Sequence, residues 1–354
     1  MLRFPLAKLN GVRQLTAVVT GDIERPIPTP IQDRRPSREM CESCHWKERF
    51  INYKLITHDY ARADEQNSRR RVRLMVKIGG GGNGADGNQL ASSGGIHYHM
   101  FSAQKVEFVA RDALRQKIPW VRVTRADGSV AEYDHIDEPL TDEERETLDV
   151  QVMECVDCHS RPAHRFQAPI RSVNLALAAG ELPRDLPFIK REAVRALDGK
   201  YPSAQEAMAG IEKSLTDFYR QKHPALLEQR AEDLDRSIEL LRTIYRETVF
   251  PEMKADWSAH LNNIGHRDSA GCFRCHNYDL ESEDGDPIFR DCKTCHLIID
   301  QIEPEASSLE GQITYEDGRI FLHPDGDEYM ENQSLCSDCH DGGFHLYQKQ
   351  EEDG

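Results

Sequence analysis

Apolar and aromatic residues are scarce in this sequence of 354 residues, at 38% and 7% respectively. A typical soluble domain is about 45–50% apolar, so side chains alone would give the two or so domains expected at this length a thin core. We therefore expect some other apolar material to fill the interior.

Long apolar runs are lacking as well. No stretch reaches the roughly 18 consecutive apolar residues of a membrane-spanning helix. The first residues, MLRFPLAKLNGVRQLTAVV, include basic residues but no continuous apolar segment of the kind found in secretory signals. From the sequence, we expect the chain as given to be soluble.

An excess of positive charge is also missing. The sequence has 45 Lys and Arg against 61 Asp and Glu, which gives a formal charge of −16. A phosphate backbone would be repelled by that charge. We therefore expect no nucleic-acid partner, and basic or neutral protein partners instead.

No cysteine stands alone. All ten fall into five copies of the pattern Cys-x-x-Cys-His, called motifs 1 to 5 below in chain order. They are Cys41-Glu-Ser-Cys44-His45, Cys155-Val-Asp-Cys158-His159, Cys272-Phe-Arg-Cys275-His276, Cys292-Lys-Thr-Cys295-His296 and Cys336-Ser-Asp-Cys339-His340.

The spacing within each motif matches covalent haem attachment. Residues i and i+3 share one face of a helical turn, so both thiols can bond the vinyl-derived carbons on one porphyrin edge, and the following histidine reaches the iron from the same side. Zinc knuckles and disulfide frameworks also use paired cysteines, but neither requires a histidine after every second cysteine. The sequence therefore predicts five covalent haem c groups, whose proximal ligands are His45, His159, His276, His296 and His340.

Haem attachment has a consequence for location. In bacteria this chemistry takes place outside the cytoplasm, so we expect a periplasmic or extracellular protein. Its leader or anchor would be missing from the given sequence, and membrane association would come through that N-terminal segment or through a partner.

Histidines are numerous enough to cap both faces of every iron. Fifteen are present, which leaves ten outside the motifs, whereas there are only eight methionines. Because a methionine ligand would raise the potential, we expect mostly bis-histidine haems of low potential. The distal candidates are His58, His97, His99, His164, His266 and His323.

Two of these candidates lie too close to a motif to serve its own iron. His164 follows His159 by five residues, and His266 precedes Cys272 by six. Neither tether can pass round a porphyrin edge, so we expect each to serve a neighbouring haem.

The remaining spacings are less restrictive. His323 lies 13 residues before Cys336 and, at about 3.3 Å per extended residue, could reach almost any nearby haem. His97 and His99 are two residues apart and would share one side of a strand, so we expect one to be a ligand and the other auxiliary.

The patterns along the chain predict a mainly α protein with extensive irregular structure and a small antiparallel β element, organised around covalent haems. KVEFVA, IPWVRVT and SVAEY between 105 and 133 are typical of that β-hairpin, with Ala-Asp-Gly-Ser as a turn. Thr141-Asp-Glu-Glu is expected to open a helix that leads into motif 2.

Two amphipathic segments split at Pro224 predict a helical hairpin. One has an apolar seam along its length, which we expect to pack on the haem core, with a dimerisation surface as the alternative. The seam consists of Leu227, Ala231, Leu234, Ile238, Leu241 and Tyr245.

These features divide the chain into five expected segments. They are a single-haem segment at 1–78, a glycine-rich loop at 79–95, the hairpin and second haem at 96–170, the helical hairpin at 171–250, and a three-haem cluster at 251–354.

Several stretches resemble multihaem c-type cytochromes of the NapC/NirT-like group. They are RPIPTP followed by RPSREMCESCHW, GIHYHM with IPWVRV downstream, ECVDCHSRPAHRF, NNIGHRDSAGCFRCH with DCKTCH, and CSDCH. The chain looks like a larger pentahaem relative that lacks the group's membrane anchor. The resemblance implies electron transfer at the outer face of the cytoplasmic membrane, and it implies His164, His266 and one of His97 and His99 as axial ligands.

The sequence thus favours a non-catalytic electron carrier of an extracytoplasmic respiratory chain, whose partners would be a quinol-oxidising membrane complex or a terminal reductase. One alternative is a nitrite or hydroxylamine reductase with one five-coordinate haem, although no motif replaces its histidine by lysine. Another is a homo-oligomeric subunit of a conductive filament or larger complex.

Overall fold

The structure is a computed structural model of the chain, and it describes residues 11–12, 15–27, 37–45, 51–80, 95–101, 103–125, 127–159, 166–267 and 269–302. Motifs 1 to 4 and the candidates His58, His97, His99 and His266 fall within these ranges. Motif 5, with Cys336, Cys339 and His340, lies outside them, as do the candidates His164 and His323.

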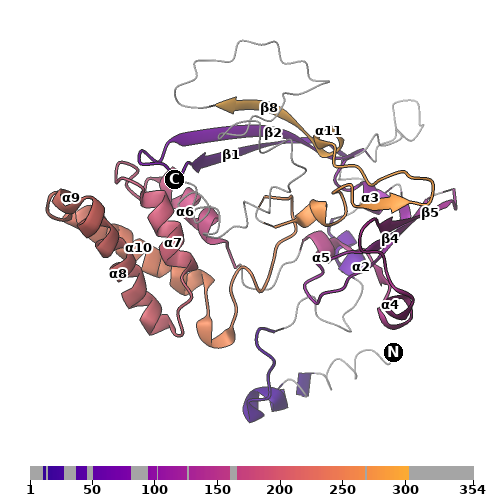
Figure 1. Cartoon of the computed structure of the whole chain (residues 1–354), viewed down its shortest axis with the longest axis horizontal. Helices are drawn as coiled ribbons and strands as arrows, with labels where there is room; N and C mark the ends of the chain where they lie inside the picture. The colour runs from indigo at the N-terminus through magenta and orange to yellow at the C-terminus, as the bar shows by residue number, and fades with distance from the viewer. Residues whose placement is uncertain are drawn as a thin grey trace.

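Two antiparallel sheets and a group of helices make up the described chain. Figure 1 shows the helices α6 to α10 at one end, a five-stranded sheet at the other, and a three-stranded sheet along one side. The sequence predicted one small β element, so the structure contains more sheet than expected.

The three-stranded sheet consists of β1 (Ile51–Ala61), β2 (Arg69–Gly80) and β8 (His296–Ile302), with β2 in the centre. β1 and β2 form a long hairpin, and β8 joins from more than 200 residues further along the chain. The arginines of β2 hide its strand pattern in the sequence. Carboxylates on the flanking strands bind them: Arg71 donates to Asp59 at 2.7 Å, and Arg73 pairs with Asp300.

The five-stranded sheet has the order β6 (Gln151–Val152), β3 (Ala103–Val109), β4 (Trp120–Arg125), β5 (Val130–His135) and β7 (Leu280–Ser282). Its centre is the β-hairpin predicted from the alternating residues, which is therefore confirmed. One face buries Val106, Phe108, Val121 and Leu280. β6 comes just before motif 2 in the chain, and β7 comes just after motif 3. Because both strands belong to this sheet, the sheet positions the two motifs relative to each other.

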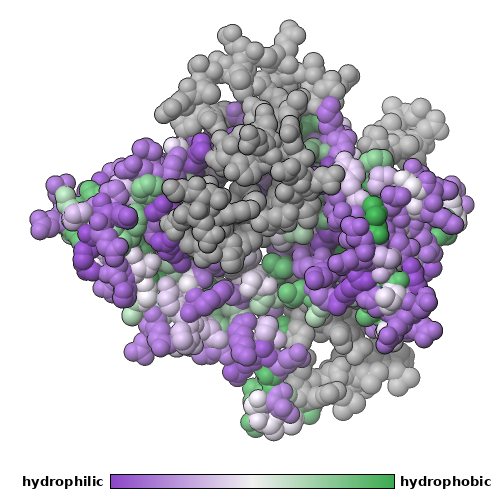
Figure 2. Space-filling view, in the orientation of Figure 1, coloured by the Kyte–Doolittle hydropathy of each residue, from purple (hydrophilic) through white to green (hydrophobic). Residues whose placement is uncertain are grey.

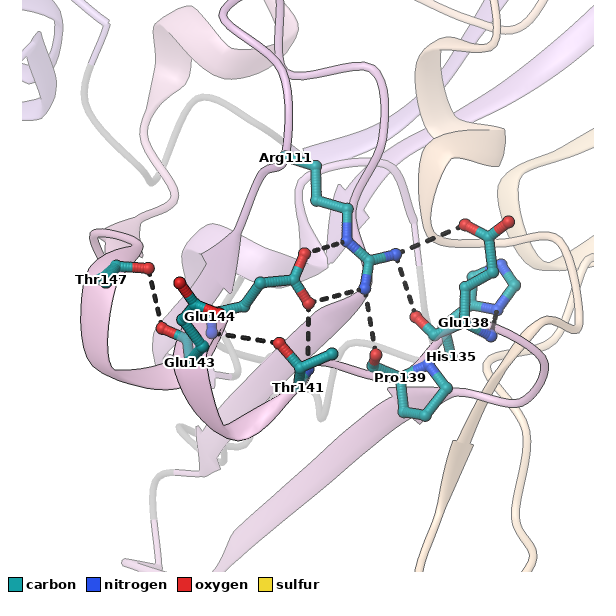
Figure 3. Close-up of polar contacts among 8 residues, drawn as sticks. All are labelled: Arg111, His135, Glu138, Pro139, Thr141, Glu143, Glu144 and Thr147. Atoms are coloured by element: carbon teal, nitrogen blue, oxygen red, sulfur yellow. Dashed lines mark hydrogen bonds and ion pairs between the residues drawn. The ribbon is translucent and has the colours of Figure 1, made fainter.

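α4 (Asp142–Thr147) begins where the sequence predicted it, with Thr141 as the N-cap (Figure 3). The Thr141 hydroxyl accepts from the Glu144 amide at 3.2 Å, and the Glu144 carboxylate accepts from the Thr141 amide at 2.9 Å. The Arg111 guanidinium donates two hydrogen bonds to that carboxylate, of 2.7 and 3.0 Å. The Arg111 guanidinium, followed by the Thr141 amide, lowers the pKa of Glu144 to about 2, so the contact is ionic at neutral pH and ties α4 to the sheet.

The helical group contains α6 (Pro169–Ala179), α7 (Ile189–Asp198), α8 (Ala204–Lys222), α9 (Pro224–Gln229) and α10 (Ala231–Thr248). Four of the predicted seam residues are buried, namely Leu234, Ile238, Leu241 and Tyr245, whereas Ala231 is exposed. The buried seam residues pack against the apolar residues of α6 to α8.

A buried polar contact joins the helices to the three-stranded sheet. Asn67, in the turn between β1 and β2, donates to the carbonyls of Arg184 and Leu186 at 2.8 Å and accepts from the Lys190 amide at 2.9 Å. The ammonium group of Lys190 donates to the Ala61 carbonyl. Burial, with Arg267 nearby, lowers the pKa of Lys190 to about 7.

Across the described ranges, no helix combines the length and apolar character needed to cross a bilayer. Figure 2 shows hydrophilic residues over most of the described surface in that view, in keeping with the formal charge of −16.

Candidate haem-binding sites

Each described motif is closed into a helical turn. Motif 1 begins in the last turn of α2 (Ser37–Glu42), and motif 2 forms α5 (Cys155–Cys158). Motif 3 lies on the 3-10 helix η3 (Gly271–Arg274), and motif 4 forms α11 (Cys292–Cys295). In every one, the amide of the histidine donates to the carbonyl of the first cysteine. The residues so bonded are His45 to Cys41, His159 to Cys155, His276 to Cys272 and His296 to Cys292. This turn brings two thiols and one imidazole together, as thioether attachment requires.

The four motifs also lie next to one another in chain order. Burial, followed by the neighbouring Cys41, raises the pKa of Cys155, and α2 lies beside α5. Burial and then Cys272 raise the pKa of Cys158 to about 12. The same two causes raise the pKa of Cys295 to about 11. The sequence suggested two separate haem segments followed by a cluster, whereas the structure gathers motifs 1 to 4 into one continuous group.

Three motif histidines face a distal candidate. The ring centroids of His97 and His159 are 6.3 Å apart with planes 1° from parallel. Those of His266 and His296 are 6.2 Å apart at 24°, and those of His99 and His276 are 5.8 Å apart at 75°.

These separations can be compared with the distance between the centroids of two imidazole rings bound on opposite sides of one iron. A metal–imidazole bond is roughly 2.0 Å and the ring centre lies about 1.1 Å beyond the nitrogen, so two imidazoles on opposite sides of one iron have centroids about 6.2 Å apart. All three pairs come within half an ångström of that value. The residues present therefore fit haem iron between each pair.

His97 and His99 do not lie on the expected strand. The chain turns at 96–97 and enters α3 (Tyr98–Phe101). Residues two apart on a helical turn point roughly 200° from one another, whereas on a strand they point the same way. The two rings therefore lie beside different motifs, His97 beside motif 2 and His99 beside motif 3, and not on one side of a strand.

In two of these histidines, the ring nitrogen Nδ1 hydrogen-bonds a backbone carbonyl. Nδ1 of His97 lies 2.8 Å from the Ile78 oxygen, and Nδ1 of His276 lies 2.7 Å from the Phe289 oxygen. Such contacts fix the tautomer and leave Nε2 for a metal. Burial, and then the nearby His276, lowers the pKa of His99 to about 4. The ring of His99 is thus neutral at pH 7, which is the form that binds metal.

Two charged residues inside the motifs were missed by the sequence reasoning. Arg274, the third residue of motif 3, is only 8% exposed. It donates to the carbonyls of Asp157, Arg115 and Gly271 at 2.9, 2.8 and 2.8 Å. Asp157, the third residue of motif 2, pairs its buried carboxylate with Arg115 and also accepts on its carbonyl from Asn263 at 3.2 Å. The contact between motifs 2 and 3 could have been suspected from the sequence, because the third residue of each motif is charged, Asp157 in one and Arg274 in the other.

A tight return of the chain places His266. Gly271 has a φ of +50°, and a Cβ there would lie 1.7 Å from the Gly265 oxygen, so only glycine fits. That oxygen accepts from the Cys272 amide at 2.9 Å. The ring of His266 then stacks on Phe273, with centroids 4.0 Å apart and planes at 14°. The same His266 ring also lies 6.2 Å from the ring of His296 in motif 4, measured between centroids.

Three other histidines lie outside these pairs. His45 is exposed, and no histidine ring among the described residues faces it. His58 is half-buried on β1, opposite Val72 of β2. His260, which the sequence reasoning did not select, is 7% exposed and stacks on Phe166 with centroids 4.6 Å apart.

Comparison with known proteins adds one informative similarity. No family model matches the chain, and no solved structure matches it. The chain is 36% identical over 335 residues to the cytochrome c-type protein ImcH of Geobacter sulfurreducens, an alignment that covers 94% of this chain and 63% of that protein. It thus spans less than two thirds of the length of this relative. Together with the motif geometry, the similarity supports a c-type cytochrome with covalently bound haem c and a role in electron transfer.

Proposed function

We propose that this chain is an electron carrier with five covalently attached, mostly bis-histidine haems, which passes electrons along closely spaced haems in an extracytoplasmic respiratory chain. The observation that carries the proposal is the set of three histidine pairs, each combining a motif histidine with a distal one at the span of a single iron. Five motifs in the sequence set the number of haems.

Among the described residues, the cysteines would attach the haem groups and the histidines would bind the iron. The cysteines of motifs 1 to 4 hold their groups by thioether bonds, and the bound haem supplies one-electron chemistry. At motifs 2, 3 and 4, the paired histidines would both bind the iron of a haem held there. A substrate would have no iron position to bind there, so these three sites favour a carrier over an enzyme.

A multihaem reductase of the nitrite or hydroxylamine type is the second candidate, and motif 1 is where it would have its open site. His45 is exposed, and the described part of the chain brings no second histidine to it.

The setting of the proposed carrier follows from its chemistry. We place it in the NapC/NirT-like group as a larger relative, located in the periplasm or outside the cell because c-type haems are attached there. With a formal charge of −16, it would exchange electrons with basic or neutral partners and not with nucleic acid. A quinol-oxidising membrane complex and a terminal reductase are the partners proposed, and a filament or homo-oligomer is the assembly to test.

Intact mass and low-temperature electron paramagnetic resonance (EPR) of the haem-loaded protein test the proposal. The mass should correspond to five haems, and a smaller number would refute the count. EPR should show low-spin ferric signals. Parallel ring planes split the iron d orbitals more than crossed planes do, so the pairs at 1° and 24° should give rhombic signals and the pair at 75° a signal with a large maximum g value.

Variants assign the signals. His97→Ala should convert one low-spin signal to high-spin. His135→Ala is the matched control. Nδ1 of His135 accepts from the Glu138 amide, so Nε2 carries the ring hydrogen and is not free for a metal. This variant should leave every signal unchanged. A native high-spin signal that vanishes in the Cys41→Ser, Cys44→Ser double variant would favour the reductase. If a high-spin signal persists there but vanishes in the Cys336→Ser, Cys339→Ser double variant, motif 5 has the open site. A signal that persists in both double variants would contradict bis-histidine capping at motifs 2 to 4.

A further inference from the structure

The three histidine pairs differ in what their second ring nitrogens touch. In the pair at motif 3, Nδ1 of His276 lies 2.7 Å from the Phe289 oxygen. At motif 2, Nδ1 of His97 lies 2.8 Å from the Ile78 oxygen. At motif 4, the Nδ1 atoms of both His266 and His296 are buried, and no described residue hydrogen-bonds either of them.

This difference bears on how well each ring donates electrons to iron. An imidazole that donates its Nδ1 hydrogen to a carbonyl becomes a more basic ligand, which stabilises the ferric state. Without that hydrogen bond, the ring is a weaker donor, and the ferrous state is relatively favoured. We propose that the His266 and His296 pair holds the haem of highest midpoint potential among the three paired sites. This inference rests on the bis-histidine ligation proposed above.

Packing explains how His266 keeps its orientation without a hydrogen bond at Nδ1. Its ring lies 4.0 Å from that of Phe273, with planes at 14°, and the tight return at Gly271 fixes the loop between them. Stacking holds the ring in place but adds little basicity. The site thus has a rigid ligand with weaker donation.

Nearby charge acts in the same direction. Reduction adds one electron to the iron and makes or breaks no bond, so the site becomes one unit less positive and nearby cations favour the change. The guanidinium of Arg290 lies 5.6 Å from the centre of the Phe273 ring that stacks on His266, and Arg267 follows His266 in the chain. Motif 3 has a cation of its own, the buried Arg274, so charge alone would not separate the two sites. The ring hydrogen bonds decide the order.

An EPR-monitored redox titration of the full haem-loaded protein tests the order. His266→Ala should first identify the motif 4 signal, as the low-spin signal that the variant loses. In the unaltered protein, that signal should be the first of the three to disappear as the potential is lowered. If it disappears second or last, the proposal is overturned. If His266→Ala removes no low-spin signal, the ligation itself is refuted, and the inference falls with it.

A second pair of variants keeps the test valid if His266→Ala does not mature. Arg290→Gln should lower the potential of the component at highest potential by more than that of any other, because Arg290 acts on His266 and also contacts the rings of Phe273 and Tyr278 beside motif 3. Arg236→Gln is the matched control, because that arginine lies on α10 with its side chain 67% exposed, and it should shift none. A larger shift on a lower component, or no shift at all, would overturn the assignment.

Discussion

Replacing Arg274 with methionine should loosen the junction between motifs 2 and 3. The side chain is 8% exposed and donates three hydrogen bonds to carbonyls, one on each of Gly271, Arg115 and Asp157. Methionine is of similar length and apolar, so Arg274→Met removes the donors and leaves little cavity. The ion pair between Arg115 and Asp157 remains in the variant, which isolates the contribution of the guanidinium.

The size of the effect follows from these partners. A hydrogen bond to a charged group contributes about 1.5–3 kcal/mol, and a buried acceptor left unpaired costs about 1–3 kcal/mol. The Asp157 carbonyl keeps a second donor, Asn263 at 3.2 Å, and the Gly271 carbonyl keeps the i→i+3 bond of the 3-10 helix η3, so the Arg115 carbonyl is the acceptor that loses its donor. Because the bonds share one side chain and do not add fully, we expect a loss of about 3 kcal/mol in the local free energy of opening.

Hydrogen–deuterium exchange measures this quantity locally, which suits a chain whose covalent cofactors make two-state global unfolding a poor assumption. A loss of about 3 kcal/mol should speed exchange of the His159 and His276 amides roughly a hundredfold. Arg236→Met is the control and should change local stability by less than about 0.5 kcal/mol. Unchanged exchange at the two motifs would refute the structural role given to Arg274, as would an equal acceleration in α8 and α10.

Three further predictions concern single side chains. Gly210→Ala should lower the thermal unfolding midpoint, although alanine favours helix by about 1 kcal/mol, because its Cβ would lie 2.1 Å from Cε1 of Tyr201 and overpacking costs about 1–3 kcal/mol; a higher midpoint would contradict the packing described. Lys190 has a pKa of about 7 in the fold, below the ordinary 10.5, so the unfolded chain binds the extra proton between those values and stability should rise with pH across that window. In denaturant titrations at pH 7 and 10, Lys190→Met should reduce this rise by at most about 4 kcal/mol, and an identical pH dependence in both proteins would refute the burial argument. Gly271→Ala should displace the His266 loop, since the new Cβ meets the backbone oxygen of Gly265, and EPR should then show one low-spin signal replaced by a high-spin one; an unaltered spectrum would contradict this placement.

The sequence predicted features whose determinants are local. The motif turns follow from the spacing of two cysteines and a histidine, and the structure closes all four described motifs in that way. The hairpin of β4 and β5 and the helix start at Thr141 follow from alternation and capping chemistry, and both are confirmed. The buried seam from Leu234 to Tyr245 follows from helical periodicity.

Features that depend on distant partners were not predictable in this way. β2 is rich in arginine and looks polar until Asp59 and Asp300 are brought beside it. The facing of His99 and His276 joins residues 177 positions apart, and no local pattern encodes it. The strand expected at His97 and His99 is a helical turn in the structure, because a spacing of two residues alone cannot distinguish the two.

The three facing pairs share an order that bears on biogenesis. His97 precedes motif 2 along the chain, His99 precedes motif 3, and His266 precedes motif 4. A protein emerges from the ribosome N-terminus first. Each distal ring has therefore been synthesised before the motif that it faces is complete. Under the proposed ligation, haem insertion at these sites can proceed motif by motif, since no iron has to wait for a later segment to supply its second ligand.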